Sequence, residues 1–242
     1  MIPRFYCPIP LAPGASVDLP AEAAHHAARV LRLDAGDQVR LFNGRGGEWL
    51  ARIERLKPTV HVSLEAFDAT DREPPLQVTL VQGLAAGDKM DWIVQKTVEL
   101  GVAAIQPVAA RRSVVRLSGD RGERRVQHWG NIAIAACEQS GRNCVPAVAP
   151  VIDLAQYLAQ PRRDNELRLV LAPRAPGRMR DLAPPAGPVT ILIGPEGGFD
   201  DGEFLAAEGV GFVAVSLGPR VLRIETAGPA ALAVIMALWG DI

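Results

Sequence analysis

Two stretches near the end of the chain decide the fold: VTILIGPEGGF at residues 189–199 and FVAVSLGPRVLRIETA at residues 212–227. Each begins as a short apolar run rich in β-branched residues and then changes into a loop that contains Gly and Pro. Such runs, bounded by turn residues, are typical of strands buried on both faces of a parallel sheet. We expect a helix after the second loop, from Pro229 to Trp239, because proline is favoured in the first helical turn.

The same alternation of strands and helices extends back to about residue 76. Predicted strands cover 76–82, 104–108 and 167–172, and predicted helices cover 88–100 and 126–140. The first helix should end at Gly101, since glycine readily adopts the left-handed conformation of a helix C-cap. This alternation predicts an α/β layer with a mostly parallel sheet, in which ligands bind at the carboxyl ends of the strands.

The first part of the chain has a different, β-rich pattern. Short segments such as QVRLFNG, EWLARIERL and TVHVSLEAF alternate partly in hydrophobicity, and one helix is expected at residues 21–31. Residues 43–47 (NGRGG) predict a hairpin turn, because Asn and Gly tolerate positive φ. The polar segment DATDREPPL at 68–76 predicts a linker. We therefore divide the chain into a small β-barrel domain, residues 1–72, and an α/β domain, residues 73–242.

The composition is that of an ordinary folded protein, with 242 residues of which 48% are hydrophobic and 22% charged. Three cysteines are too few for a disulfide framework, and no His or Cys pair has the spacing of zinc ligands, so we predict no metal site. The N-terminus has three prolines by residue 10 and no apolar signal-peptide core. The longest apolar stretch, about 227–239, is too short to span a membrane. We expect a cytoplasmic protein without a membrane segment.

The net charge of −1 hides an uneven distribution of cations. Residues 111–125 (RRSVVRLSGDRGERR) hold six arginines against Asp120 and Glu123, a local charge of +4. From Gly194 to the end, two arginines stand against seven acids, a charge of −5. A segment that concentrates cations can bind a polyanion even in a nearly neutral protein. The alternative is a solvated, arginine-rich helix.

The loop Ile193–Phe199 is the first candidate site. Three glycines in residues 194–198 let backbone amides approach a ligand closely, and Glu196 adds a carboxylate. The loop lacks the Lys-Ser/Thr of a phosphate-binding P-loop and the GxGxxG spacing of dinucleotide-binding folds. The alternative is a tight turn into a helix that is capped by Asp200 and Glu203.

The loop Leu217–Ala227 is the second candidate site. Thr226 is predicted to cap the following helix, whose amides would then point at a bound group. Arg223 and Glu225 flank apolar side chains of the same loop, so a ligand would meet a charged edge and an apolar wall together. The alternative is a capped helix start with surface charges. Two such loops after consecutive predicted strands favour a shared crevice.

A third candidate is ACEQSGRNCVP at residues 136–146, where polar groups gather at a predicted helix exit. Their donors and acceptors suit a base edge, a phosphate or a helix cap. Glu138 and Arg142 are four residues apart, so an i,i+4 ion pair is an alternative. Cys137 has no histidine nearby in the sequence, and we expect it to be buried rather than a nucleophile.

Five segments together resemble a known family. They are GPEGGF, LGPRVLRIETA, ACEQSGRN, QKTVELGVAAIQPV with the following ARRSV, and HHAARVLRLDAGDQVRLFNGRGGEW. Across nearly the whole chain they resemble the RsmE family, bacterial methyltransferases of the SPOUT class that modify uridine N3 in 16S ribosomal RNA. The resemblance implies an α/β domain with a deep trefoil knot, a PUA-like RNA-binding β-barrel before it, and a homodimer through the knotted domains. It also implies S-adenosylmethionine as the cofactor and 16S ribosomal RNA, or the assembled small subunit, as the partner.

The resemblance assigns the cofactor to the loops after the last strands. Its expected contacts are Leu171, Ile193, Gly194, Pro195, Glu196, Gly197, Gly198, Leu217, Gly218, Arg220, Val221, Leu222, Arg223, Thr226 and Ala227. Arg223 is expected to be a cation near the substrate, and Glu138 or Glu225 to accept the N3 proton. The expected RNA phosphate contacts are Arg4, Arg111, Arg112, Arg116 and Arg142. Two alternatives stay open: a knotted methyltransferase for a ribose 2′-hydroxyl or a tRNA base, and a non-catalytic RNA-binding assembly factor.

Overall fold

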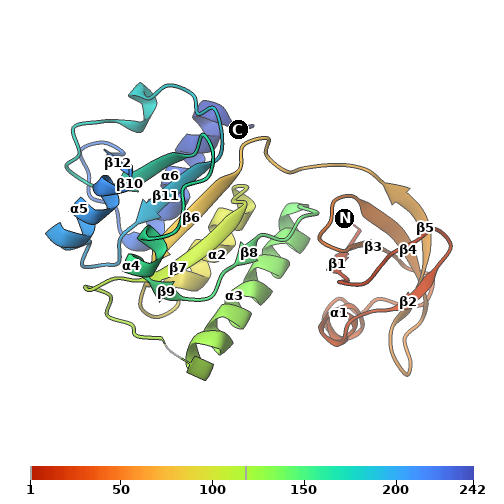
Figure 1. The fold of residues 1–242 in the computed structure, drawn as a ribbon. Helices are drawn as coiled ribbons and strands as arrows, with labels where there is room; N and C mark the ends of the chain where they lie inside the picture. The colour runs from red at the N-terminus through yellow and green to blue at the C-terminus, as the bar shows by residue number, and fades with distance from the viewer. Residues whose placement is uncertain (1, 118) are drawn as a thin grey trace. The chain divides into compact units, whose positions relative to one another are not determined.

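The computed structural model describes residues 2–117 and 119–242, which divide into two compact units (Figure 1). The N-terminal unit comprises the chain up to Glu73 together with Ile134–Val145. The C-terminal unit comprises Pro74–Ala133 and Pro146–Ile242. Among the described residues, we find no helix with the length and hydropathy needed to cross a membrane.

A five-stranded sheet with the order β1-β3-β4-β5-β2 forms the N-terminal unit. Its strands are β1 (Arg4–Tyr6), β2 (Ser16–Asp18), β3 (Gln38–Phe42), β4 (Glu48–Arg55) and β5 (His61–Asp68). β3 and β4 are antiparallel neighbours joined by residues 43–47, which confirms the predicted hairpin. Gly44 and Gly46 in this turn have φ angles of 82° and 91°, a conformation that favours glycine.

One helical segment covers the core of this sheet. The sequence predicts a single helix over 21–31, whereas the structure has α1 (Ala21–His25) followed by a π-helical turn, η1 (His26–Val30). Ala23 and Ala27 are buried on the face that packs against the sheet. They share a core with Phe5, Val39, Leu41, Ile53 and Val62. The small alanine side chains allow the helix to lie close to the strands.

A seven-stranded sheet forms the C-terminal unit, and its described pairings are all parallel. The order is β12-β10-β11-β6-β7-β8, with β9 also paired to β7. The strands are β6 (Val78–Gly83), β7 (Ala104–Ala109), β8 (Ala147–Val148), β9 (Ile152–Asp153), β10 (Leu167–Leu171), β11 (Val189–Ile193) and β12 (Val213–Val215). All five residues of β11 are buried, as expected for a strand covered on both faces. The predicted parallel α/β layer is confirmed.

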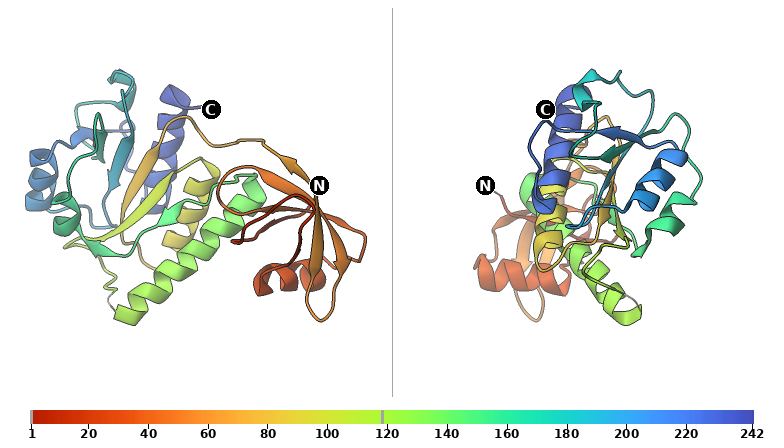
Figure 2. Two further views of the ribbon diagram at one scale, coloured as in Figure 1. Left: turned by 45° about the vertical axis from the view of Figure 1, so that its right-hand side comes forward. Right: turned by 90° about the vertical axis from the view of Figure 1, so that its left-hand side faces the viewer.

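Helices cover both faces of this sheet (Figure 2). They are α2 (Lys89–Glu99), α3 (Gly119–Ser140), α4 (Leu154–Leu158), α5 (Asp201–Gly209) and α6 (Ile224–Trp239), with a short 3-10 turn, η2 (Met179–Asp181). α2 and α6 pack together on one face, where Gly228 of α6 lies against Leu80 of β6. α4 and α5 lie on the other face and share a core cluster with Val81, the next residue of β6. Successive residues of one strand therefore face two helical layers.

Two helices begin earlier than the sequence predicts. α3 begins at Gly119 instead of residue 126, because the Arg and Glu residues of its first turns favour a helix but show no apolar periodicity. α6 begins at Ile224 instead of Pro229, with Arg223 as its N-cap residue. The prediction that Thr226 caps this helix is wrong, since Thr226 lies in the first turn and its amide donates to the Arg223 carbonyl (2.9 Å).

Candidate functional site

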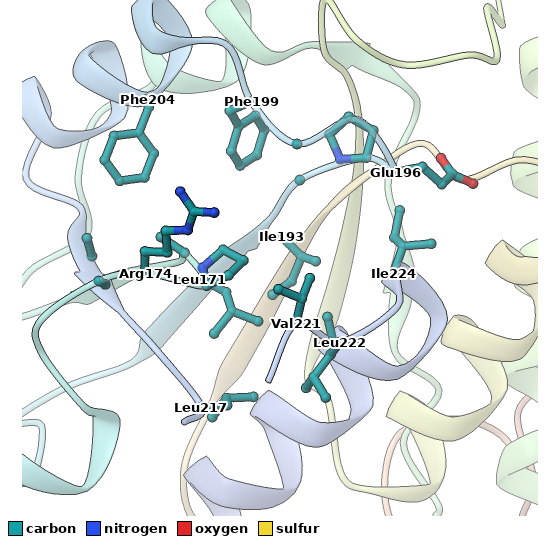
Figure 3. Close-up of a pocket in the computed structure, with 18 of the residues that line it drawn as sticks. Leu171, Arg174, Ile193, Glu196, Phe199, Phe204, Leu217, Val221, Leu222 and Ile224 are labelled. Carbon is teal, nitrogen blue, oxygen red and sulfur yellow. The ribbon is translucent and has the colours of Figure 1, made fainter. Parts of the chain in front are cut away.

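A cavity of about 1160 Å³ lies at the carboxyl ends of β10, β11 and β12 (Figure 3). Most of its lining comes from three loops, at residues 171–176, 193–199 and 217–227. β10 lies between β11 and β12 in the parallel sheet, so the three loops leave neighbouring strands at one edge. The crevice predicted between the last two loops is part of this cavity, and the 171–176 loop adds a further wall.

The glycine loop, residues 194–199, is held by close backbone contacts. The Gly198 amide donates to the Pro195 carbonyl (2.8 Å), which closes a tight turn. A Cβ atom on Gly83, the last residue of β6, would lie 2.5 Å from the Pro195 nitrogen. A side chain at position 83 would therefore displace the glycine loop.

Glu196 ties the glycine loop to the connection between β6 and α2. Its Oε1 atom accepts hydrogen bonds from the Ala86 amide (2.9 Å) and from the Lys89 Nζ atom (3.0 Å). Burial opposes the ionisation of Glu196, but these hydrogen bonds outweigh it and lower the pKa of the carboxyl group. Glu196 is therefore an ionised anchor of the loop, and Lys89 joins it at the edge of the cavity.

A capping box starts the helix that follows the glycine loop. The Glu203 amide donates to Asp200 Oδ1 (2.7 Å), and the Asp200 amide donates to Glu203 Oε2 (3.1 Å). The hydrogen bond from the Glu203 amide is the main cause of the lowered pKa of Asp200. The capped turn expected as the alternative to a ligand site is thus present, and the same loop also lines the cavity.

Apolar side chains from all three loops surround one part of the cavity. Figure 3 shows Leu171 at the end of β10, Ile193 at the end of β11, and Leu217, Val221 and Leu222 after β12, gathered around the same space. Val221 is 76% exposed, so its side chain is open to a ligand. An apolar or aromatic group of a ligand would cover these side chains.

Charged groups stand at the start of α6, beside this apolar wall. Arg223 is the exposed N-cap residue, and Glu225 follows in the first turn. The Oε2 atom of Glu225 is buried, and within the described part of the chain we find no hydrogen-bond partner for it. Burying an oxygen without a hydrogen-bond donor costs free energy, so we expect a donor group of a ligand or of water to form a hydrogen bond with it.

Family models match both parts of the chain. Residues 72–236 match an RNA methyltransferase domain, and residues 19–65 match an RNA methyltransferase PUA domain. The chain belongs to this family of RNA methyltransferases. The predicted PUA-like and methyltransferase domains are confirmed by these matches, whereas the knot and the homodimer stay predictions.

Individual relatives cover nearly the whole chain. The ribosomal RNA small subunit methyltransferase E of Bacillus subtilis is 34% identical over 88% of this chain and 87% of its own length. A crystal structure of ribosomal RNA small subunit methyltransferase E from Neisseria gonorrhoeae, bound to S-adenosyl methionine, is 42% identical with a TM-score of 0.95, covering 100% of this chain and 99% of that one. A methyltransferase from Legionella pneumophila in complex with the same cofactor is 40% identical over all of both chains, with a TM-score of 0.95. These matches confirm the resemblance to the RsmE family.

The cavity lining contains the predicted cofactor residues of this family apart from Gly197, Gly218 and Thr226. Gly197 instead packs against the loop after β7, where a Cβ atom would lie 3.0 Å from the Cβ atom of Arg112. Gly218 has a φ angle of 109° and allows the turn after β12. Thr226 is exposed in the first turn of α6.

Sequence reasoning missed the loop after β10 and the aromatic part of the cavity. Arg174 lines the cavity, and Figure 3 shows its guanidinium group near Phe199 and Phe204. The APRAPG stretch at 172–177 carries no recognisable motif, but it follows a strand that the sequence does predict. The rule that ligands bind at strand carboxyl ends, applied to this strand as well, would have found the loop.

Glu138, the other predicted proton acceptor, lies in the N-terminal unit. Its Oε1 atom accepts a hydrogen bond from the Tyr6 amide (2.9 Å), and burial raises the pKa of the carboxyl group. Cys137 beside it is fully buried, as the sequence predicts. This burial raises the pKa of its thiol to about 12. Among the described residues, no group of three His, Cys, Asp or Glu side chains is arranged to hold a metal ion.

Two of the predicted RNA contacts, Arg4 and Arg142, are buried within the N-terminal unit. The Arg4 side chain is 9% exposed and donates to Glu48 (3.0 Å) and to the Cys137 carbonyl (2.6 Å). Arg142 is 5% exposed, and its Nε atom donates to Glu73 Oε2 (3.0 Å). Both guanidinium groups support the fold of this unit, which disagrees with the prediction that they bind phosphates. Arg111, Arg112 and Arg116 are exposed after β7.

Proposed function

We propose that this protein transfers a methyl group from S-adenosylmethionine to N3 of a uridine in 16S ribosomal RNA. The observation that carries the proposal is its full-length similarity, at 42% identity, to a ribosomal RNA small subunit methyltransferase E bound to S-adenosyl methionine. The cavity at the ends of β10, β11 and β12 supports it, because the sequence motifs of the family line that cavity.

The chemistry of the cavity fits the cofactor. S-adenosylmethionine combines an adenine, a ribose and a charged methionine portion, and when bound it supplies an activated methyl group on a sulfonium sulfur. The apolar wall of Leu171, Ile193 and Leu222 suits the adenine, and the glycine loop offers backbone groups to polar edges. Arg174, Lys89 and Glu196 supply charges for the methionine portion. The volume of about 1160 Å³ leaves room for a nucleobase beside the cofactor.

Arg223 and Glu225 are the proposed catalytic residues. Uridine must lose its N3 proton before N3 can accept a methyl group, so the site needs a proton acceptor and a cation for the developing charge. Glu225 has a buried oxygen without a described donor, and it can accept a hydrogen bond from N3–H. Arg223 is the adjacent exposed cation. Glu138 is a second candidate acceptor, but the Tyr6 amide already binds it in the N-terminal unit.

RNA binding is the proposed task of the domain at residues 1–72, together with the exposed arginines Arg111, Arg112 and Arg116 of the domain at residues 73–242. The match of residues 19–65 to the PUA domain of RNA methyltransferases supports the first part. The target uridine must be unpaired or flipped out, because N3 is occupied in a base pair. We also propose that the protein is a cytoplasmic homodimer through its knotted domain and acts on the small ribosomal subunit or its free RNA.

One labelling experiment tests the proposed cofactor, acceptor atom and RNA substrate together. The purified protein is incubated with methyl-labelled S-adenosylmethionine and small subunits that lack the modification, and the labelled nucleoside is identified after digestion. We expect 3-methyluridine at a single site. Label on a ribose hydroxyl or another base would contradict the acceptor, and bound cofactor without label would indicate an assembly factor. In a parallel reaction with transfer RNA, label there but not on the subunits would contradict the substrate.

A further inference from the structure

The loop after β7 contacts the glycine loop directly. The Nη1 atom of Arg112 donates to the carbonyls of Gly197 (3.2 Å) and Phe199 (3.3 Å). The backbones are also close, since a Cβ atom on Gly197 would lie 3.4 Å from the Arg112 carbonyl oxygen. Arg112 does not line the cavity, whereas Gly198 and Phe199 of the loop that it holds do.

These hydrogen bonds fix two peptide groups of the glycine loop at both ends. Arg112 binds the Gly197 carbonyl, while the amide of the same peptide group, on Gly198, donates to Pro195 (2.8 Å). Arg112 also binds the Phe199 carbonyl, while the amide of that peptide group, on Asp200, donates to Glu203 (3.1 Å). Neither peptide group can rotate without breaking a hydrogen bond.

The neighbouring residue ties the same segment to the start of α5. The Arg111 amide donates to Glu203 Oε1 (2.8 Å), and the Nη1 atom of the Arg111 side chain pairs with Asp200 (3.0 Å). The Arg111 side chain is 76% exposed, so its ion pair is expected to contribute little to stability. Of these two arginines, Arg112 is therefore the one whose side chain contacts the cavity-lining part of the loop.

We propose that Arg112 is a positioning residue, which holds the glycine loop in the conformation that receives the cofactor. The identity of the cofactor in this inference rests on the proposed function. Arg112 acts through the Gly197 and Phe199 carbonyls, a role distinct from the phosphate contact that the sequence suggests for it. A loop that is already ordered loses less conformational freedom on binding, so cofactor affinity depends on Arg112 even without RNA.

The first test is isothermal titration calorimetry of S-adenosylmethionine and S-adenosylhomocysteine into the full-length protein without RNA. Arg112→Ala is expected to raise both Kd values by about tenfold, because two hydrogen bonds from a charged donor are lost. Arg112→Lys keeps a cationic donor and should recover a large part of this loss. Arg124→Ala is the charge-matched control, since Arg124 is an exposed arginine on α3, and its Kd should stay within about twofold of wild type.

The second test is hydrogen exchange of the ligand-free proteins, read on peptides that cover residues 194–203. We expect faster exchange in Arg112→Ala, and exchange close to wild type in Arg112→Lys and Arg124→Ala. Wild-type affinity and wild-type exchange in Arg112→Ala would overturn the proposal, as would an equal loss in Arg124→Ala. A wild-type protein that binds neither cofactor form would instead refute the proposed function, while the exchange measurement still tests whether Arg112 holds the loop.

Discussion

At the scale of single residues, Gly83 decides how closely β6 and the glycine loop approach each other. A Cβ atom there would lie 2.5 Å from the Pro195 nitrogen and 2.8 Å from the Gly194 carbonyl carbon. Both atoms are backbone, so a methyl group cannot be accommodated by a rotamer change and the loop itself must move. The site thus depends on a residue that does not line the cavity.

Gly83→Ala is therefore expected to lower the free energy of unfolding by about 1–3 kcal/mol and to weaken cofactor binding. Urea unfolding and calorimetry measure the two effects. Gly130→Ala in α3 is the matched control, because a Cβ atom there has no neighbour within 4 Å. That variant should be neutral, or more stable by about 0.5–1 kcal/mol, since alanine favours a helix. Equal stability of the two variants would show that the contact at Gly83 does not constrain the loop.

Glu225 carries the proposed chemistry, and a single isosteric change tests it. Glu225→Gln keeps the size of the side chain but cannot accept a proton, so we expect kcat for methyl transfer to fall by about 100-fold with the cofactor Kd nearly unchanged. Glu138→Gln is the comparison variant in the N-terminal unit. A larger loss of kcat in Glu138→Gln than in Glu225→Gln would move the proton acceptor to Glu138.

At the scale of elements, Glu166 links strands at the edge of the sheet opposite the cavity. It precedes β10, accepts a hydrogen bond from Thr190 of β11 (2.6 Å) and pairs with Arg163 (2.8 Å), which also donates to Thr79 of β6 (3.3 Å). Burial opposes its ionisation, but hydrogen bonds from Thr190, Arg168 and Arg163 outweigh it and lower the pKa of Glu166 to about 2. The ionised carboxylate therefore stabilises the junction of three parallel strands.

The lowered pKa sets the pH range in which Glu166 matters. Its contribution is complete above the ordinary pKa of 4.5 and is lost as the pH falls toward about 2. Glu166→Gln should lower the free energy of unfolding at neutral pH by roughly 2–3 kcal/mol. Between about pH 5 and pH 2, the free energy of unfolding should fall less in this variant than in the wild type. Urea unfolding across this range measures both. Parallel pH profiles for the variant and the wild type would contradict the assigned role.

How much of this architecture is visible in the sequence depends on whether local patterns or distant partners determine it. The buried run Val189–Ile193 and the turn at residues 43–47 carry their own signals, and the structure has both. The sequence places the start of α6 at Pro229 because proline is favoured in a first turn, whereas the helix begins at Ile224 and Pro229 lies inside it. The burial of Arg4 depends on Glu48, 44 residues away, which no local pattern reveals.

At the scale of the whole molecule, four of the arginines that the sequence predicts to bind RNA divide into two pairs with different tasks. Arg4 pairs with the buried Glu48 and donates to the Cys137 carbonyl, and Arg142 pairs with the half-buried Glu73, all within the N-terminal unit. Arg111 and Arg116 are exposed in the segment of high positive charge. Only exposed guanidinium groups release counterions when they meet a phosphate, so the second pair should determine the electrostatic part of RNA affinity.

This division predicts how RNA binding responds to salt. Fluorescence anisotropy with a labelled 16S ribosomal RNA fragment should show affinity falling steeply between about 50 and 200 mM salt. Arg111→Ala and Arg116→Ala should each reduce the slope of log affinity against log salt by about 1. Arg180→Ala, which removes an exposed arginine of η2 outside that segment, should leave the slope close to wild type. A flat salt dependence in the wild type, or equal slopes in all three variants, would mean that residues 111–116 do not bind the RNA backbone and that its affinity comes from other surfaces.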